Sequence, residues 1–150
     1  MIVDSSIPFD TARIGAAAVY CSDGRYGEQM DQFLHVSLGL PRYDRLAVPG
    51  GIAPLAGHLI AWREEEALAQ QLRFLIESHA LTRLVLIAHQ DCGFYVHRLG
   101  YRVLEREQQQ CLDLVKCAQR IRSFASHLRV EAYFARVSDS TVFFEPVDIG

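Results

Sequence analysis

Runs of consecutive apolar residues alternate along this chain with segments in which apolar residues recur every three or four positions. Residues 14–21 are small and apolar throughout, which is typical of a strand buried on both faces of a parallel sheet. Residues 83–88 read as a second such strand, in which Arg83 precedes five apolar residues, and residues 45–48, Arg-Leu-Ala-Val, read as a shorter one that ends before Pro49. Because proline lacks a backbone N–H, we expect the shorter strand to stop there.

Two segments have the periodicity of amphipathic helices. In residues 64–79, apolar side chains recur at spacings of three and four between glutamates and glutamines, at Leu68, Leu72, Leu75 and Ile76. Residues 103–128 form a longer segment of the same kind, which contains two cysteines, Cys111 and Cys117. Because these two thiols are six positions apart, they lie on different faces of a helix and cannot bind one metal ion together.

The C-terminal part of the chain has the pattern of a pair of strands. Residues 129–137 are strand-like, residues 138–140 have turn chemistry, and residues 141–144 form another short apolar run. The order of the elements predicts an α/β fold in which one domain, residues 1–150, has a central, mostly parallel β-sheet flanked by helices.

Composition narrows the range of partners. Half of the 150 residues are hydrophobic, which is enough for one sizeable core, and the net charge is -3. Acidic and basic residues are interspersed, so neither nucleic acid nor a membrane surface is an expected partner. No apolar run reaches the roughly 18 residues of a membrane span, and the first twenty residues do not resemble a signal peptide. The four cysteines are too few for a disulfide framework, which favours a cytoplasmic location.

Candidate chemistry gathers in two short segments, each at the end of a predicted strand. Residues 21–25 read Cys-Ser-Asp-Gly-Arg, and residues 89–93 read His-Gln-Asp-Cys-Gly. If the two strands are neighbours and parallel, their carboxyl ends meet at one edge of the sheet and bring Cys21, His89 and Cys92 together. Two sulfurs and one imidazole nitrogen suit tetrahedral zinc, with a fourth position left open.

The pair Cys-x-Asp-x-Arg and His-x-x-Cys-Gly resembles the zinc motifs of the β-class carbonic anhydrases. The resemblance implies that Cys21, His89 and Cys92 bind Zn²⁺ and that Asp23 and Arg25 are catalytic. It also implies a sheet of four or five strands and a homodimer or higher oligomer with the active site near the subunit boundary. The implied activity is the reversible hydration of carbon dioxide, a small-molecule substrate, to bicarbonate.

Within this resemblance, Asp23 has two possible roles. If it pairs with Arg25, it is held off the metal and can accept the hydrogen bond that orients the nucleophile. If it leaves Arg25, it can itself ligate zinc and close the site. Gly93 and the helix start that follows it offer backbone donors for substrate binding.

The sequence also departs from the family pattern. The family commonly has Arg-Asn-Ala-Gly between the two motifs, whereas residues 48–51 here read Val-Pro-Gly-Gly, and no glutamine occurs before Gln29. Two alternatives to carbon dioxide hydration therefore stay open. One is hydrolysis of a related small molecule, carbonyl sulfide or carbon disulfide. The other is a non-catalytic relative in which zinc only braces the fold.

The remaining polar and aromatic candidates have ordinary structural interpretations beside functional ones. Asp91 is either a partner of the metal ligands or a loop or helix-cap carboxylate. Phe94 and Tyr95 either line an apolar pocket or belong to the core. His97 lies soon after the second motif, residues 89–93, here called the metal loop, and is a candidate for proton transfer. The other histidines are expected to be structural or surface residues: His35, His58, His79 and His127.

Overall fold

The computed structural model describes residues 1–150, and its centre is a five-stranded sheet with the order β2-β1-β3-β4-β5. The strands are β1 (Ala16–Cys21), β2 (Asp44–Val48), β3 (Arg83–His89), β4 (Arg129–Ser138) and β5 (Thr141–Pro146). The first four run parallel, and β5 is antiparallel to β4. The predicted α/β fold with a mostly parallel sheet is confirmed.

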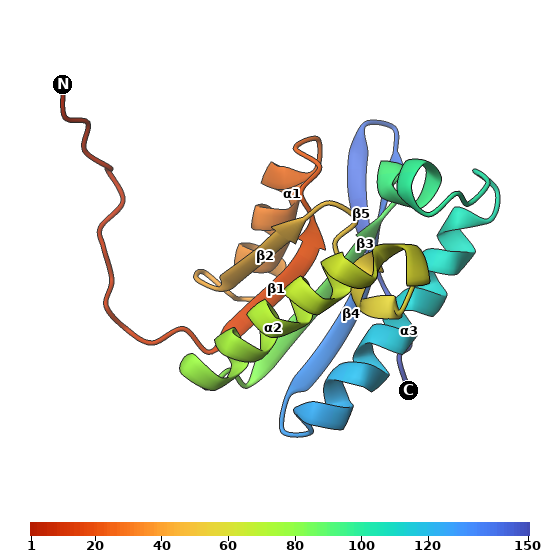
Figure 1. The fold of residues 1–150 in the computed structure, drawn as a ribbon. Coiled ribbons are helices and arrows are strands. Elements are labelled where there is room, and N and C mark those ends of the chain that lie inside the picture. The colour runs from red at the N-terminus through yellow and green to blue at the C-terminus, as the bar shows by residue number, and fades with distance from the viewer.

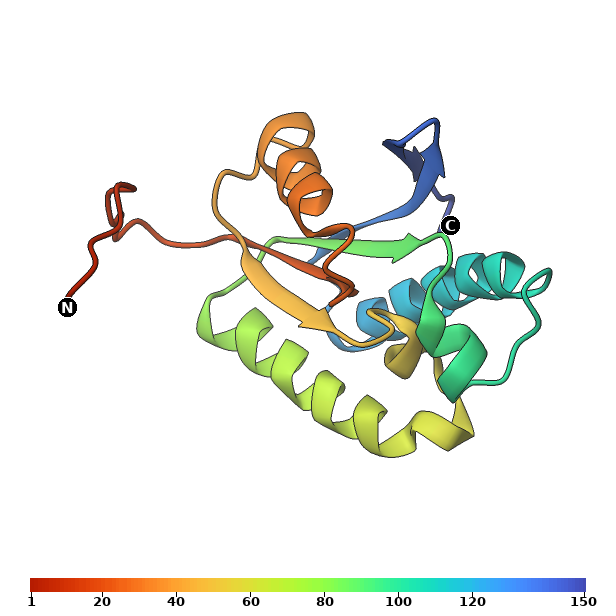
Figure 2. The same cartoon turned by 90° about the horizontal axis from the view of Figure 1, so that it is seen from above.

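Helices cover both faces of this sheet (Figure 1). On one face lies α1 (Gly27–Gln32), which continues into the π-helical turn η1 (Phe33–Ser37). On the other lie α2 (Trp62–Ser78) and α3 (Arg106–Phe124), as the view from above shows (Figure 2). Three short helical segments complete the chain: η2 (Ala53–Ala56), η3 (Leu59–Ala61) and η4 (Phe94–Arg98). No helix has both the length and the apolarity that crossing a bilayer requires.

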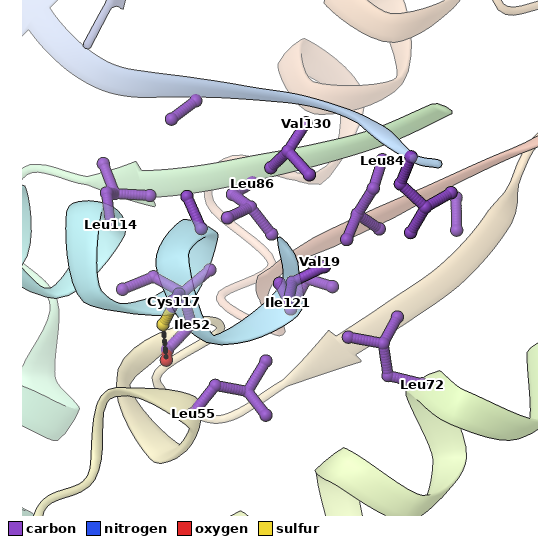
Figure 3. Close-up of a cluster of buried hydrophobic side chains, with 14 of the residues drawn as sticks. Val19, Ile52, Leu55, Leu72, Leu84, Leu86, Leu114, Cys117, Ile121 and Val130 are labelled. Carbon is purple, nitrogen blue, oxygen red and sulfur yellow. Dashed lines mark hydrogen bonds between the residues drawn. The ribbon is translucent and has the colours of Figure 1, made fainter. Parts of the chain in front are cut away.

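The central strands are buried on both faces because side chains alternate along them. In β1, Ala16, Ala18 and Tyr20 face α1, whereas Ala17 and Val19 face α2 and α3. The core beneath α2 and α3 is the larger of the two and is mostly aliphatic (Figure 3). Its labelled members come from strands, helices, the η2 segment and the residue before η2: Val19, Ile52, Leu55, Leu72, Leu84, Leu86, Leu114, Cys117, Ile121 and Val130.

A fully buried carboxylate, that of Asp113, lies in α3 among the apolar residues of its packed face. Asp113 accepts hydrogen bonds from the Tyr95 hydroxyl at 2.8 Å and from Gln109 Nε2 at 2.7 Å. His58 Nε2 lies 2.6 Å from the same carboxylate. Tyr95 is therefore a core residue and not part of a pocket, and His58 has the structural role that we expected.

Candidate metal centre

The two candidate motifs meet because β1 and β3 are neighbouring parallel strands. Their register places Val19 opposite Leu86, so that the carboxyl ends of both strands lie at one edge of the sheet. Cys21 ends β1 and His89 ends β3, while Cys92 follows in the next turn. One donor atom from each of these three residues lies within 4.8 Å of the other two.

The His89 ring is oriented so that one nitrogen remains without a partner. Its Nδ1 lies 2.8 Å from the Gln90 backbone oxygen, which can only accept, so Nδ1 carries the proton. Its Nε2 then presents a lone pair, and this atom is buried with no hydrogen-bond partner. A buried polar atom without a partner costs free energy of folding, and a metal ion bound to Nε2 would supply the missing partner.

The two cysteines favour a cation at the same place. Cys92 is buried and Cys21 is half-buried. A hydrogen bond from the Cys92 thiol lowers the pKa of Cys21 to about 4, and the same hydrogen bond raises the pKa of Cys92. Two sulfurs that share one proton beside a free imidazole lone pair are a donor set that zinc fits well.

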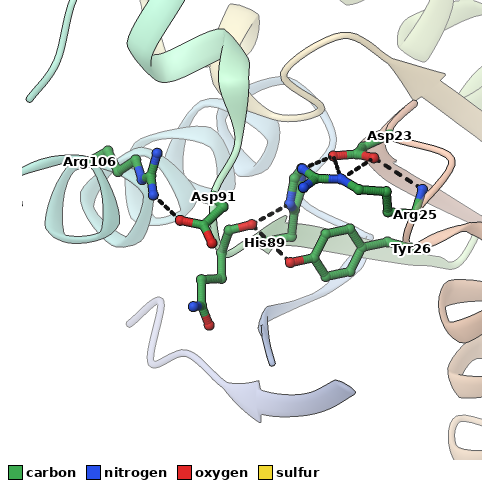
Figure 4. A network of polar contacts seen from close by, with 7 residues as sticks. Asp23, Arg25, Tyr26, His89, Asp91 and Arg106 are labelled. Atoms are coloured by element: carbon green, nitrogen blue, oxygen red, sulfur yellow. Dashed lines mark hydrogen bonds and ion pairs between the residues drawn. The ribbon is translucent and has the colours of Figure 1, made fainter. Parts of the chain in front are cut away.

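Asp23 and Arg25 form a bidentate ion pair beside the candidate metal ligands (Figure 4). Arg25 Nη2 lies 2.6 Å from Asp23 Oδ2, and Arg25 Nε lies 3.0 Å from Asp23 Oδ1. These hydrogen bonds from Arg25 lower the pKa of Asp23 to about 2, so the carboxylate stays ionised at neutral pH. Of the two arrangements that the sequence leaves open, the structure shows the paired one.

A cavity of about 470 Å³, here called the mouth, opens beside the candidate ligands. Its lining is Cys21, Ser22, Asp23, Pro49, Gly50, Gly93, Phe94, His97 and Arg98. Gly93 and His97 both line the mouth; substrate binding by Gly93 and proton transfer by His97 stay predictions. A Cβ atom on Gly93 would lie 3.4 Å from the His97 ring.

The segment that departs from the family pattern forms one wall of the mouth, and its glycines are dictated by close contacts. Gly51 has φ +56°, and a Cβ atom there would lie 2.7 Å from the Cys21 backbone nitrogen. Gly50 has φ +79°, and its Cβ would lie 2.6 Å from the Phe94 ring. Both positions therefore require glycine. With Pro49 beside them, they make this wall apolar, where the family commonly has arginine and asparagine.

A second cavity, here called the apolar groove, adjoins the mouth and shares Pro49, Phe94 and Arg98 with it. Its volume is about 360 Å³, and it lies between α2 and the end of β2. The remaining lining is Val48, Pro54, Glu64, Ala67, Leu68 and Gln71. Arg98 is paired with Glu64 at 2.9 Å, so the groove presents no free charge and suits uncharged molecules.

Two residues around the metal loop were not predicted from the sequence. Tyr26 donates a hydrogen bond to the Gln90 backbone oxygen at 2.9 Å, and Arg106 from α3 forms an ion pair with Asp91. The pairing makes Asp91 a loop residue held by α3 and not a contact of the candidate ligands. Neither residue has a periodicity signal, although Tyr26 directly follows the first motif.

Comparison with known proteins agrees with this architecture. A family model described as "Putative carbonic anhydrase" matches residues 12–145. The chain resembles the β-carbonic anhydrase CafA of Aspergillus fumigatus with TM-score 0.55 and 13% identity, covering 92% of this chain and 77% of that one. It resembles β-carbonic anhydrase isoform I of Trichomonas vaginalis with TM-score 0.57 and 12% identity, covering 93% and 87%.

A third solved structure, the β-carbonic anhydrase CafD of Aspergillus fumigatus, has TM-score 0.54 and 12% identity, covering 93% of this chain and 94% of that one. Among curated proteins, none has a sequence that matches. At such identities the solved structures establish the fold alone, whereas the family model spans most of the sequence. The chain therefore belongs to this carbonic anhydrase family, and its fold is that of the β-carbonic anhydrases.

Proposed function

We propose that the protein binds one Zn²⁺ through Cys21, His89 and Cys92 and catalyses the reversible hydration of carbon dioxide to bicarbonate. The observation that carries the proposal is the buried, unpartnered Nε2 of His89, on a ring that offers one nitrogen within 4.8 Å of two cysteine sulfurs next to an open mouth. We also propose that the protein works in the cytoplasm, where its four free thiols would stay reduced.

Zinc in such a site supplies a nucleophile at neutral pH, because it lowers the pKa of a water molecule from about 15.7 to about 7. The residues of the mouth orient the attacking water and accommodate the substrate. Asp23, ionised and fixed by Arg25, accepts a hydrogen bond from the attacking water and orients its lone pair toward the substrate. The apolar wall formed by Pro49 and Phe94 accommodates uncharged carbon dioxide and favours the departure of charged bicarbonate.

The test is an assay of zinc-loaded protein for carbon dioxide hydration and carbonyl sulfide hydrolysis in parallel. We expect about one zinc per chain, and hydration measured by stopped flow to exceed that of the same concentration of free zinc by several orders of magnitude. A protein with full zinc content that shows neither reaction at any pH where it is folded would instead be a metal-braced relative without catalytic activity.

Hydrolysis of carbonyl sulfide or carbon disulfide is the second candidate function. It is favoured by the apolar groove, which reaches the mouth through Pro49 and Phe94 and is larger than carbon dioxide requires. In the parallel assay, this candidate is supported if turnover of carbonyl sulfide exceeds that of carbon dioxide at equal concentrations.

We further propose that the protein is a homodimer or a higher homo-oligomer. Residues 1–9 form an arm that stands clear of the body in both views, ahead of the point where Arg42 holds Asp10 and Ala12 (Figures 1 and 2). The arm carries two exposed aromatic or branched side chains near its anchor, Ile7 at 78% exposure and Phe9 at 92%. Trp62, at the start of α2, is also more than half exposed. Unpartnered apolar surface of this kind is typical of association sites.

Sedimentation velocity of the full chain is therefore expected to show a dimer or larger species at micromolar concentration. Phe9→Asp should weaken association, because burying an aspartate at an interface is costly. Phe143→Asp, which changes an exposed phenylalanine on β5, is the matched control. A wild-type monomer at all concentrations would contradict the proposal. If Phe143→Asp dissociated the oligomer and Phe9→Asp did not, the interface would lie at β5 and not at the arm.

A further inference from the structure

We propose that Tyr26 is a positioning residue for His89: by holding the Gln90 carbonyl, it fixes which imidazole nitrogen faces the candidate metal position. This inference rests on the proposed metal binding, and it is independent of the substrate. It concerns the network in Figure 4, where side chains from α3 and from the turn before α1 surround the metal loop.

The key atom is the backbone oxygen of Gln90, which accepts two hydrogen bonds. One comes from His89 Nδ1 at 2.8 Å and the other from the Tyr26 hydroxyl at 2.9 Å. The carbonyl has two lone pairs, so both donors are satisfied at once. As long as this oxygen points at the imidazole, Nδ1 must keep its proton. Nε2 is then the ring nitrogen whose lone pair is free to bind a metal ion.

The orientation of this carbonyl is not guaranteed by the local backbone. The next residue, Asp91, has φ +59°, a left-handed conformation that costs a non-glycine residue free energy. Rotation of the peptide between residues 90 and 91 would relieve this strain and turn the oxygen away from His89. Contacts from outside the loop must therefore hold the peptide in place.

Three elements supply those contacts. From β4, the Ala135 oxygen accepts from Gln90 N at 2.8 Å, and the Val137 N–H donates to Gln90 Oε1 at 3.0 Å. From α3, Arg106 pairs with Asp91. Tyr26 is the contact among these that binds the carbonyl oxygen itself.

The Tyr26 ring also limits the movement of His89. The two ring centroids lie 4.4 Å apart with an interplanar angle of 46°, and Tyr26 is only 5% exposed. Ring packing alone would restrict the position of the imidazole but would not select between its two tautomers. The hydroxyl group, acting through the carbonyl, makes that selection.

The test compares Tyr26→Phe with Tyr43→Phe. Tyr43 is a matched control, because it is another buried tyrosine of the same core cluster, and its hydroxyl donates to Asp31 away from the metal loop. We expect Tyr26→Phe to weaken zinc binding roughly 10- to 100-fold in a chelator competition, the usual cost of losing a partner of a metal-ligating histidine. Tyr43→Phe should leave zinc affinity unchanged.

Long-range ¹H–¹⁵N spectra of the histidine rings provide the readout that a purely structural role would not move. In zinc-loaded wild-type protein, His89 should be protonated at Nδ1 and coordinated through Nε2. In zinc-free Tyr26→Phe, the His89 signals should shift toward a mixture of tautomers, whereas in Tyr43→Phe they should match the wild type. Unchanged affinity together with an unchanged His89 pattern in Tyr26→Phe would overturn the inference.

Wild-type protein gives a second measurement that does not depend on a variant folding. The His89 Nδ1 proton and the Tyr26 hydroxyl proton belong to buried residues and are hydrogen-bonded, so both should exchange slowly with solvent. Because they share one acceptor, they should also show a nuclear Overhauser contact with each other. Coordination of zinc through Nδ1, or the absence of these protected protons, would also overturn the inference. A protein that passes these tests but hydrates no carbon dioxide would refute the proposed reaction and leave the role of Tyr26 intact.

Discussion

Cys92→Ser is expected to reduce zinc affinity by on the order of a hundredfold or more and to leave the purified protein with little metal. A structural zinc site supplies about 10–16 kcal/mol, so one ligand in about four contributes about 3 kcal/mol, and a serine hydroxyl does not replace a thiolate. Elemental analysis and chelator competition measure the loss. Any hydration or hydrolysis activity should fall with the zinc content.

The matched control for this variant is Cys117→Ser, since both cysteines are buried and both are free thiols. The Cys117 sulfur donates to the Ile52 oxygen at 3.2 Å, a hydrogen bond that a serine hydroxyl can also make. Zinc content should therefore stay at the wild-type value. Full zinc content in Cys92→Ser would show that the metal, if bound, has a different set of ligands.

Arg25→Ala should lower catalytic turnover by on the order of a hundredfold while zinc content remains at the wild-type value. Removing the guanidinium frees Asp23, which can then approach the metal position and block it. The Arg25 side chain is 66% exposed, so its loss should cost the fold little. Stopped-flow assays combined with zinc analysis separate this result from loss of the metal.

The reciprocal variant, Asp23→Ala, should also keep zinc and lose activity, because the acceptor that orients the attacking water is gone. Arg129→Ala is the control for both, as it breaks another arginine–carboxylate pair, with Glu131 at 3.1 Å, at the start of β4 and thus at the opposite edge of the sheet from the mouth. Its turnover should be unchanged. If Arg25→Ala and Asp23→Ala both kept full activity, the pair would be structural and the proposed mechanism would be wrong.

The sequence predicted those parts of the fold whose patterns are local. The run at residues 14–21 contains β1, and residues 83–88 contain nearly all of β3, because a strand buried on both faces is apolar along its buried length, which in β3 begins after Arg83. The amphipathic periodicity likewise located α2 and α3, although α3 begins at Arg106 and ends at Phe124, inside the predicted 103–128. Helix ends depend on contacts that periodicity does not contain.

The pattern did not predict α1 or its π-helical continuation. α1 has six residues and buries only Met30, which is too little for a helical period to be recognised. The same limit applies to η4, whose five residues place Phe94 and His97 in the wall of the mouth. Short segments take their conformation from what they pack against, so they were visible only in the tertiary structure.

The sequence by itself determined the type of sheet and the identity of the three candidate ligands. Each cysteine or histidine ligand lies at or just after the end of an apolar run, so a local pattern is enough to identify it. Only the tertiary structure decided that Asp23 is paired with Arg25, that glycine is required at Gly51, and that Tyr26 reaches the Gln90 carbonyl. The Asp23–Arg25 pair depends on the conformation of one loop, and the other two depend on distances between atoms of different segments. Such distances are set by how the strands, helices and loops pack, which no local pattern in a single sequence records.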